Sequence, residues 1–82
     1  MKLEIVQKDG YNIHFIENPS LQVQLAAIEQ NEYAIKFIKN PSYEIQLSAI
    51  MHNPDAIKYI NNPSEDIQLL AITEYAKQGI YK

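Results

Sequence analysis

Few side chains in this sequence have both the type and the spacing that catalysis requires. The two histidines, His14 and His52, lie far apart, and no Asp, Glu or Cys recurs beside them at the spacing of metal ligands. The two glycines, Gly10 and Gly79, are too distant to form a phosphate-binding loop. We therefore expect no catalytic residues, no metal site and no cofactor, and we predict that the protein is not an enzyme.

A second group of residues has the chemistry to hold a small molecule. Tyr11 and Tyr33 recur at an interval of 22 residues, close to His14, Lys36 and Lys58. Aromatic rings stack on bases and lysines neutralise phosphate, so these five residues form a candidate nucleotide-binding site. Tyrosines at a regular interval also occur as plain packing at the edge of a core, which is the interpretation we favour.

The interval of 22 residues belongs to a repeat that covers most of the chain. The phrases NPSLQVQLAAI, NPSYEIQLSAI and NPSEDIQLLAI begin at Asn18, Asn40 and Asn62. Self-similarity at a fixed period is typical of proteins built from stacked units. Turning each phrase at about 100° per residue gathers most of its apolar side chains on one face, which predicts an amphipathic helix. In the first phrase the face predicted to be buried carries Leu21, Val23, Leu25, Ala27 and Ile28.

Each unit contains two signals for a helix start. The first is an asparagine before proline, an arrangement that predicts an N-cap followed by the first helical residue, with breaks before Pro19, Pro41 and Pro63. The second is a further capping residue in the same unit. Its three occurrences are Asp9, Asn31 and Asn53, and the last predicts a further break before Pro54. The unit is therefore expected to pair a helix of about three turns with one of about two turns.

These signals predict an all-α fold, specifically a short-helix α-solenoid of helix-turn-helix repeats with a 22-residue period. We expect a single domain over residues 1–82. Within it, residues 1–17 form a truncated first unit, 18–39 and 40–61 form full units, and 62–82 form a C-terminal capping helix. An array this short has ends that leave apolar surface open, so a homodimer through the repeat ends is a further expectation.

A glutamine stands inside each apolar phrase, on the face predicted to be buried. The three are Gln24, Gln46 and Gln68. An unpaired buried amide costs about 1–3 kcal/mol, so we expect each to bond backbone groups where a short helix ends and the next long helix begins. Three such amides would form a ladder that fixes the stacking register. The aromatic residues at the other recurring position, Phe15, Phe37 and Tyr59, are expected in the core or in the packing between units.

Composition narrows the classes of partner. The 82 residues include no cysteine and carry a net charge of -3, with seven lysines, ten acids and mixed signs along the chain. This balance lacks the clustered basic residues of a nucleic-acid-binding surface. No stretch approaches the roughly 20 apolar residues needed to span a bilayer, and charges interrupt the first ten residues where a signal peptide is apolar. We expect a soluble, cytoplasmic protein without membrane or nucleic-acid partners.

The run NPSxxxQLxAI followed by NxxAIKxIxNPS, within residues 9–72, resembles the short α-helical repeats that recur in uncharacterised bacterial and bacteriophage proteins. It is similar in a looser sense to HEAT and leucine-rich-variant solenoids. The resemblance implies a helical solenoid used for binding, in some cases a phage product that acts on host machinery. It implies no particular site residues.

The leading functional hypothesis is a non-enzymatic protein-binding module. In its specific form it is a phage-encoded inhibitor that docks on a host protein or defence complex in the host cytoplasm. Repeat proteins use their variable outward positions for recognition, and apolar side chains among acids are typical of contact surfaces. The predicted partner-binding residues are Glu44, Ser48, Met51, His52, Asp66 and Leu70. The alternatives are a nucleotide or small-molecule sponge and a purely structural, self-assembling repeat protein.

Overall fold

The computed structural model describes residues 2–79, and every regular element in that range is helical. The α-helices are α1 (Lys2–Lys8), α2 (Leu21–Gln30), α3 (Tyr43–His52) and α4 (Glu65–Lys77). They alternate with the 3₁₀ helices η1 (Gly10–Phe15), η2 (Glu32–Phe37) and η3 (Pro54–Tyr59). The prediction of an all-α fold is confirmed for this range. None of its helices is long and apolar enough to cross a membrane.

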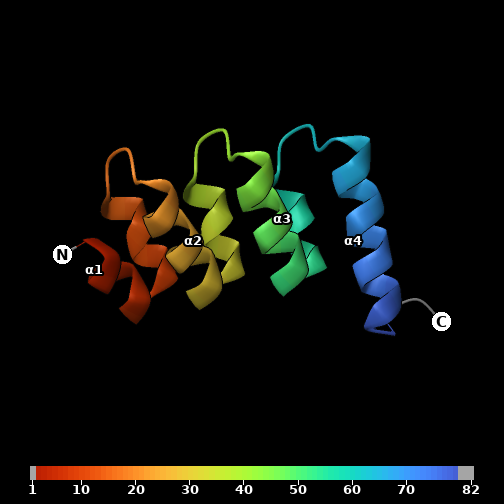
Figure 1. Ribbon diagram of the computed structural model, residues 1–82, viewed down its shortest axis with the longest axis horizontal. Helices are drawn as coiled ribbons and strands as arrows, with labels where there is room; N and C mark the ends of the chain where they lie inside the picture. The colour runs from red at the N-terminus through yellow and green to blue at the C-terminus, as the bar shows by residue number, and fades with distance from the viewer. Residues whose placement is uncertain (1, 80–82) are drawn as a thin grey trace.

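The helices form two layers that run along the long axis of the molecule (Figure 1). The helices α1 to α4 contact one another in chain order, and η1 to η3 do the same in the second layer. The molecule measures 43 × 23 × 16 Å. The three loops that lead from a 3₁₀ helix to the next α-helix all lie along one edge, at the top of Figure 1. We call this edge the loop edge.

A serine, and not an asparagine, caps each of α2, α3 and α4. The Oγ atom of Ser42 accepts the N–H of Ile45 at 3.3 Å, and Ser20 and Ser64 make the same bond in their helices. Asn40 has a φ of 51°, in the left-handed region that asparagine tolerates better than most residues. The helix starts predicted before Pro19, Pro41 and Pro63 are therefore wrong by two residues, because the asparagine turns the chain and the helix begins after the serine.

The elements that follow α1, α2 and α3 are 3₁₀ helices of six residues each. Their predicted caps are confirmed. The side chains of Asp9, Asn31 and Asn53 each accept the backbone N–H two residues further on, at 3.0 Å. The last turn closes with a bond between residues three apart, as from the Ile38 N–H to the Ile35 carbonyl, which is the pattern of a 3₁₀ helix. The break predicted before Pro54 is also correct.

Aliphatic side chains fill the space between the two layers and between successive α-helices. Ile28, Ile45 and Ile50 are fully buried, and Val6 of α1 is as well. Val6 therefore joins the same core as the isoleucines of α2 and α3. Leu21 was expected on the buried face but is exposed, because it is the first residue of α2 and lies next to the loop edge.

Candidate binding faces

The outer side of the α-helices carries the residues predicted to bind a partner. Glu44, Met51, His52 and Asp66 are exposed there, whereas Ser48 and Leu70 are half-buried and Leu70 packs against the core. The His52 ring is held by its own helix, since its Nδ1 lies 2.8 Å from the Ser48 carbonyl oxygen. Four of the six predicted residues are therefore exposed, and the other two are half-buried.

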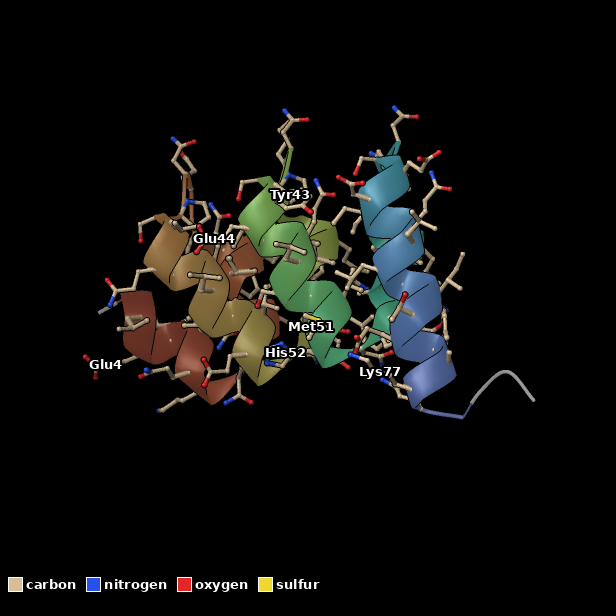
Figure 2. All side chains as sticks on the ribbon, turned by 45° about the vertical axis from the view of Figure 1, so that its right-hand side comes forward. Glu4, Tyr43, Glu44, Met51, His52 and Lys77 are labelled. Carbon is tan, nitrogen blue, oxygen red and sulfur yellow. The ribbon has the colours of Figure 1, made fainter. Side chains whose placement is uncertain are left out.

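The exposed apolar side chains of α3 also lie apart from one another. Figure 2 shows Tyr43 at one end of this helix and Met51 beside His52 at the other. Met51 is 54 % exposed and Tyr43 is exposed to a similar degree. The outer side of α3 therefore presents two separate apolar side chains rather than one apolar patch.

The aromatic residues predicted for the core or for the packing between units lie on the surface of the 3₁₀ layer, where Phe37 and Tyr59 contact rings of a neighbouring 3₁₀ helix. Phe15, Phe37 and Tyr59 are 80 %, 37 % and 38 % exposed. The predicted burial of these rings assumes that the segments are α-helices, which turn 100° per residue. A 3₁₀ helix turns 120° per residue. Over the five steps from Glu32 to Phe37 the difference grows to about 100°, which is enough to move a ring from the core to the surface.

These rings meet the residues of the candidate nucleotide site on the same face. The ring of Phe37 lies 5.7 Å from that of Tyr11 and 4.8 Å from that of His14, and Tyr33 and Tyr59 are 5.4 Å apart. We call this group of side chains the aromatic row. Its members are Tyr11, His14, Phe15, Tyr33, Phe37 and Tyr59.

Lys36 connects the aromatic row across all three 3₁₀ helices. Its Nζ atom lies 5.2 Å from the ring centres of Tyr11 and Phe37 and 5.8 Å from that of Tyr59. A cation over ring faces is attracted by the negative charge of the π-system. The lysine is therefore held on the row rather than extended into solvent.

Lys58, the last residue of the candidate nucleotide site, forms an ion pair with a carboxylate. Its Nζ lies 3.6 Å from Oδ2 of Asp55, whose Oδ1 accepts a hydrogen bond from the Tyr75 hydroxyl of α4. The Tyr75 hydroxyl is the main cause that lowers the pKa of Asp55; burial opposes this lowering to a smaller extent, and the charge of Lys58 adds to it. Part of the charge of Lys58 is thus neutralised locally.

Two open grooves lie beside the aromatic row at the loop edge. The first has a volume of about 400 Å³ and lies between the loop before α2 and the end of η2. The second has a volume of about 610 Å³ and lies between the loop before α3 and the end of η3. Phe37, Ile38 and Lys39 line both, so the grooves adjoin at the end of η2.

The two grooves have linings that correspond position by position. Asn18, Pro19 and Gln24 in the first groove stand where Asn40, Pro41 and Gln46 stand in the second. Sequence reasoning missed both grooves. The recurrence of the Asn-Pro-Ser phrase and its glutamine was visible, but no sequence signal showed that they border an open space.

The glutamines close the loops from which the α-helices start. Nε2 of Gln46 donates to the Pro41 carbonyl at 2.9 Å, and the same bond joins Gln24 to Pro19 and Gln68 to Pro63. The prediction that each amide bonds backbone at the joint between two helices is confirmed. The predicted ladder between units is wrong, because each amide reaches back only five residues within its own unit.

Within residues 2–79, no three His, Asp or Glu side chains lie close enough together to hold a metal ion. Comparison with known proteins finds no match for this chain among protein families, curated proteins or solved structures.

Proposed function

We propose that this protein is a non-enzymatic module that binds a protein partner on the aromatic row, and not on the outer side of the α-helices. The main support for this proposal is the exposure of the aromatic rings in this row. Phe15 is 80 % exposed, and the rings of Phe37 and Tyr59 on the same side of the molecule are 37 % and 38 % exposed. Contiguous exposed apolar surface marks interaction sites, and aromatic side chains supply a large share of the affinity at protein interfaces.

The finer description of the fold belongs to the same proposal. We regard the chain as a short α-solenoid with a unit of 22 residues. The serine caps at Ser20, Ser42 and Ser64 support this description, as do the two corresponding grooves. In such an array each unit contributes one segment to a continuous binding face.

The ring geometry favours a protein partner over a nucleotide. A base sandwiched between two rings needs them about 7 Å apart, twice the contact distance of roughly 3.5 Å. Tyr11 and Phe37 meet edge to face at 5.7 Å, and Tyr33 and Tyr59 do so at 5.4 Å. The rings therefore fill one another's space, while their outer edges stay open to a partner's side chains. An inhibitor that docks on a host protein would use this same face.

Two matched variants test the assignment of the face. Phe15→Ser removes a ring of the aromatic row, and Met51→Ser removes the exposed apolar side chain near the end of α3. Both side chains are mostly exposed, so both variants should keep the melting temperature of the parent. Displayed random peptides are first selected on the parent chain, and their affinity for each variant is then measured.

The proposal predicts that selected peptides bind Phe15→Ser at least about tenfold more weakly and bind Met51→Ser as they bind the parent. The reverse pattern would place binding on the α-helices. Failure of the selection to yield any peptide sensitive to Phe15→Ser would reject the aromatic row as the binding face.

A second candidate function is self-assembly through the end of the stack, which the exposed side of α4 favours. Ile72 and Leu69 are more than half exposed there, whereas Ile28 and Ile50 at the position of Ile72 are fully buried. A second copy of the chain is the occupant we propose for this side. Sedimentation velocity over a range of concentrations tests it: Ile72→Asp should abolish any dimer, and a parent that stays monomeric at high concentration would exclude it.

A further inference from the structure

We infer that the partner segment bound by this face is acidic and extended, and that it places two apolar side chains in the two grooves with carboxylates between them. The inference rests on the proposed function, because it specifies the ligand of the same face. It follows from the charge of the groove lining, from the polar groups that the lining offers, and from the distance between the grooves.

The charge of the lining is positive although the chain is acidic as a whole. Lys36 and Lys39 line the second groove, Lys39 also lines the first, and no carboxylate is among the lining residues of either. The chain carries a net charge of -3, so this local excess of lysine does not follow from composition. Residues 37–39 line both grooves. Carboxylates of a partner segment that lies over these residues would be close to both Lys36 and Lys39.

Lys36 is already positioned on the aromatic row for contact with a carboxylate of the partner. Lys36 is already held over the rings of Tyr11, Phe37 and Tyr59, so binding an acid restricts its side chain less than it would restrict a free lysine. Oppositely charged groups at the edge of a contact mainly raise the association rate and select the partner. The lysines therefore select an acidic segment over a neutral or basic one.

The grooves also offer hydrogen-bonding groups of the kind that an extended backbone needs. Asn40, Gln46 and Asn61 line the second groove. Nε2 of Gln46 donates to the Pro41 carbonyl. The Oε1 atom of the same amide can therefore accept a hydrogen bond from a backbone N–H of the partner segment. An extended segment has no internal hydrogen bonds, and its N–H and C=O groups remain available to these amides.

The distance between the grooves matches three residues of an extended chain. The grooves correspond position by position, so they are displaced by the advance from α2 to α3. Packed helices lie about 8–10 Å apart. A chain in the polyproline II conformation rises about 3.1 Å per residue and turns once every three residues, which gives about 9 Å between side chains on the same side. Apolar residues three positions apart therefore fit the two grooves, where Ile16 and Phe37 line the first and Phe37 and Tyr59 line the second.

The test uses a capped hexapeptide, Pro-Leu-Glu-Glu-Leu-Pro, titrated into the isotope-labelled 82-residue chain and followed by amide NMR. Three control peptides change either the charge or the order of the residues. One replaces both glutamates with glutamine, one replaces them with lysine, and the third, Pro-Glu-Leu-Leu-Glu-Pro, keeps the composition but makes the leucines adjacent. The prolines disfavour a helical peptide.

We expect saturable shifts at Phe37, Ile38, Lys39 and Gln46 with the first peptide, and at least fivefold weaker binding of each control. Lys39→Gln should weaken binding by a similar factor. Lys8→Gln, the same substitution at an exposed lysine of α1 outside the groove lining, should not. Equal binding of the glutamate, glutamine and lysine peptides would overturn the acidic character. Equal binding of the peptide with adjacent leucines would overturn the spacing.

Failure of the inference is distinguishable from failure of the proposed function. Selected peptides that depend on Phe15, combined with no shifts from the acidic hexapeptide, would reject the ligand chemistry and keep the binding face. If no selected peptide depends on Phe15 and the acidic hexapeptide causes no shifts, the aromatic row is rejected as the binding face. Shifts confined to the α-helices would also reject both.

Discussion

Ile50 and Ile72 are each the eighth residue after the serine that caps their helix, yet Ile50 is fully buried and Ile72 is 53 % exposed. The difference comes from the neighbours of each helix. α3 is covered by α4 and η3, whereas within the described residues α4 packs only on α3 and η3 behind it. Burial at this position is therefore supplied by the next element of the stack and not by the helix that carries the isoleucine.

The first prediction uses this pair. Ile50→Ala should lower the free energy of unfolding by about 2–5 kcal/mol, because it removes packed methyl groups and leaves a cavity. Ile72→Ala should cost less than about 1 kcal/mol, since its side chain is already largely solvated. Urea unfolding of both variants measures the difference. Equal losses would mean that the side of α4 is covered in solution.

The second prediction separates the roles of Asn40 and Ser42. Ser42→Ala should cost about 1 kcal/mol of unfolding free energy by removing the cap of α3. Asn40→Ala should cost about 1–2 kcal/mol because alanine is strained at a φ of 51°, whereas Asn40→Gly should be nearly neutral. Thermal and urea unfolding measure all three. A neutral Ser42→Ala would contradict the assignment of the cap.

The third prediction concerns the amide that closes the loop before α3. Gln46→Leu removes the donor to the Pro41 carbonyl and should cost about 1 kcal/mol, although leucine is more hydrophobic. Gln68→Leu makes the same change at an exposed position, where water replaces the amide, and should cost less. Urea unfolding of the two variants provides the comparison, and a Gln46→Leu variant more stable than the parent would refute the role of the amide.

The fourth prediction concerns pH. The Tyr75 hydroxyl is the main cause that holds the pKa of Asp55 below its ordinary value of 3.8, so Tyr75→Phe should raise that pKa. A carboxyl group with a lowered pKa in the folded state stabilises the protein above pH 3.8, and this contribution is lost as the pH falls through the folded-state pKa. The destabilisation by Tyr75→Phe should therefore be larger at pH 6 than at pH 2.

NMR titration of Asp55, together with urea unfolding at the two pH values, checks this prediction. Asp55→Asn is the control, because it removes the titrating group and the pH dependence with it. An unchanged pKa of Asp55 in Tyr75→Phe would contradict the assigned cause.

Part of the candidate site could be read from the sequence. The equal intervals between Tyr11 and Tyr33 and between His14 and Lys36 indicated that these residues lie on one side of the molecule. Ring contacts with Phe37 and Tyr59 and the position of Lys36 over both rings bring them together there. Lys39 and the grooves were not foreseen. A groove is a space between two loops, and its existence depends on how far the packed helices hold those loops apart.

The sequence by itself determined the features that depend on bonds between near neighbours. Capping at Asp9, Asn31 and Asn53 and the bond from each glutamine to a nearby carbonyl follow from side chains that reach backbone groups two to five residues away. The all-helical character and the apolar face of each α-helix follow from the spacing of residues along the chain.

Only the tertiary structure decided which of two capping side chains is used and which apolar residues are covered. Asn40 and Ser42 both have the chemistry of a cap, and the choice is made by the path of the loop from the 3₁₀ layer to the α-helix. Phe15 and Phe37 both end a 3₁₀ helix, but only Phe37 has the ring of Tyr11 from a neighbouring 3₁₀ helix against it. Local pattern specifies a helix and its cap, whereas burial requires a neighbouring helix, and the position of that neighbour is a property of the whole fold.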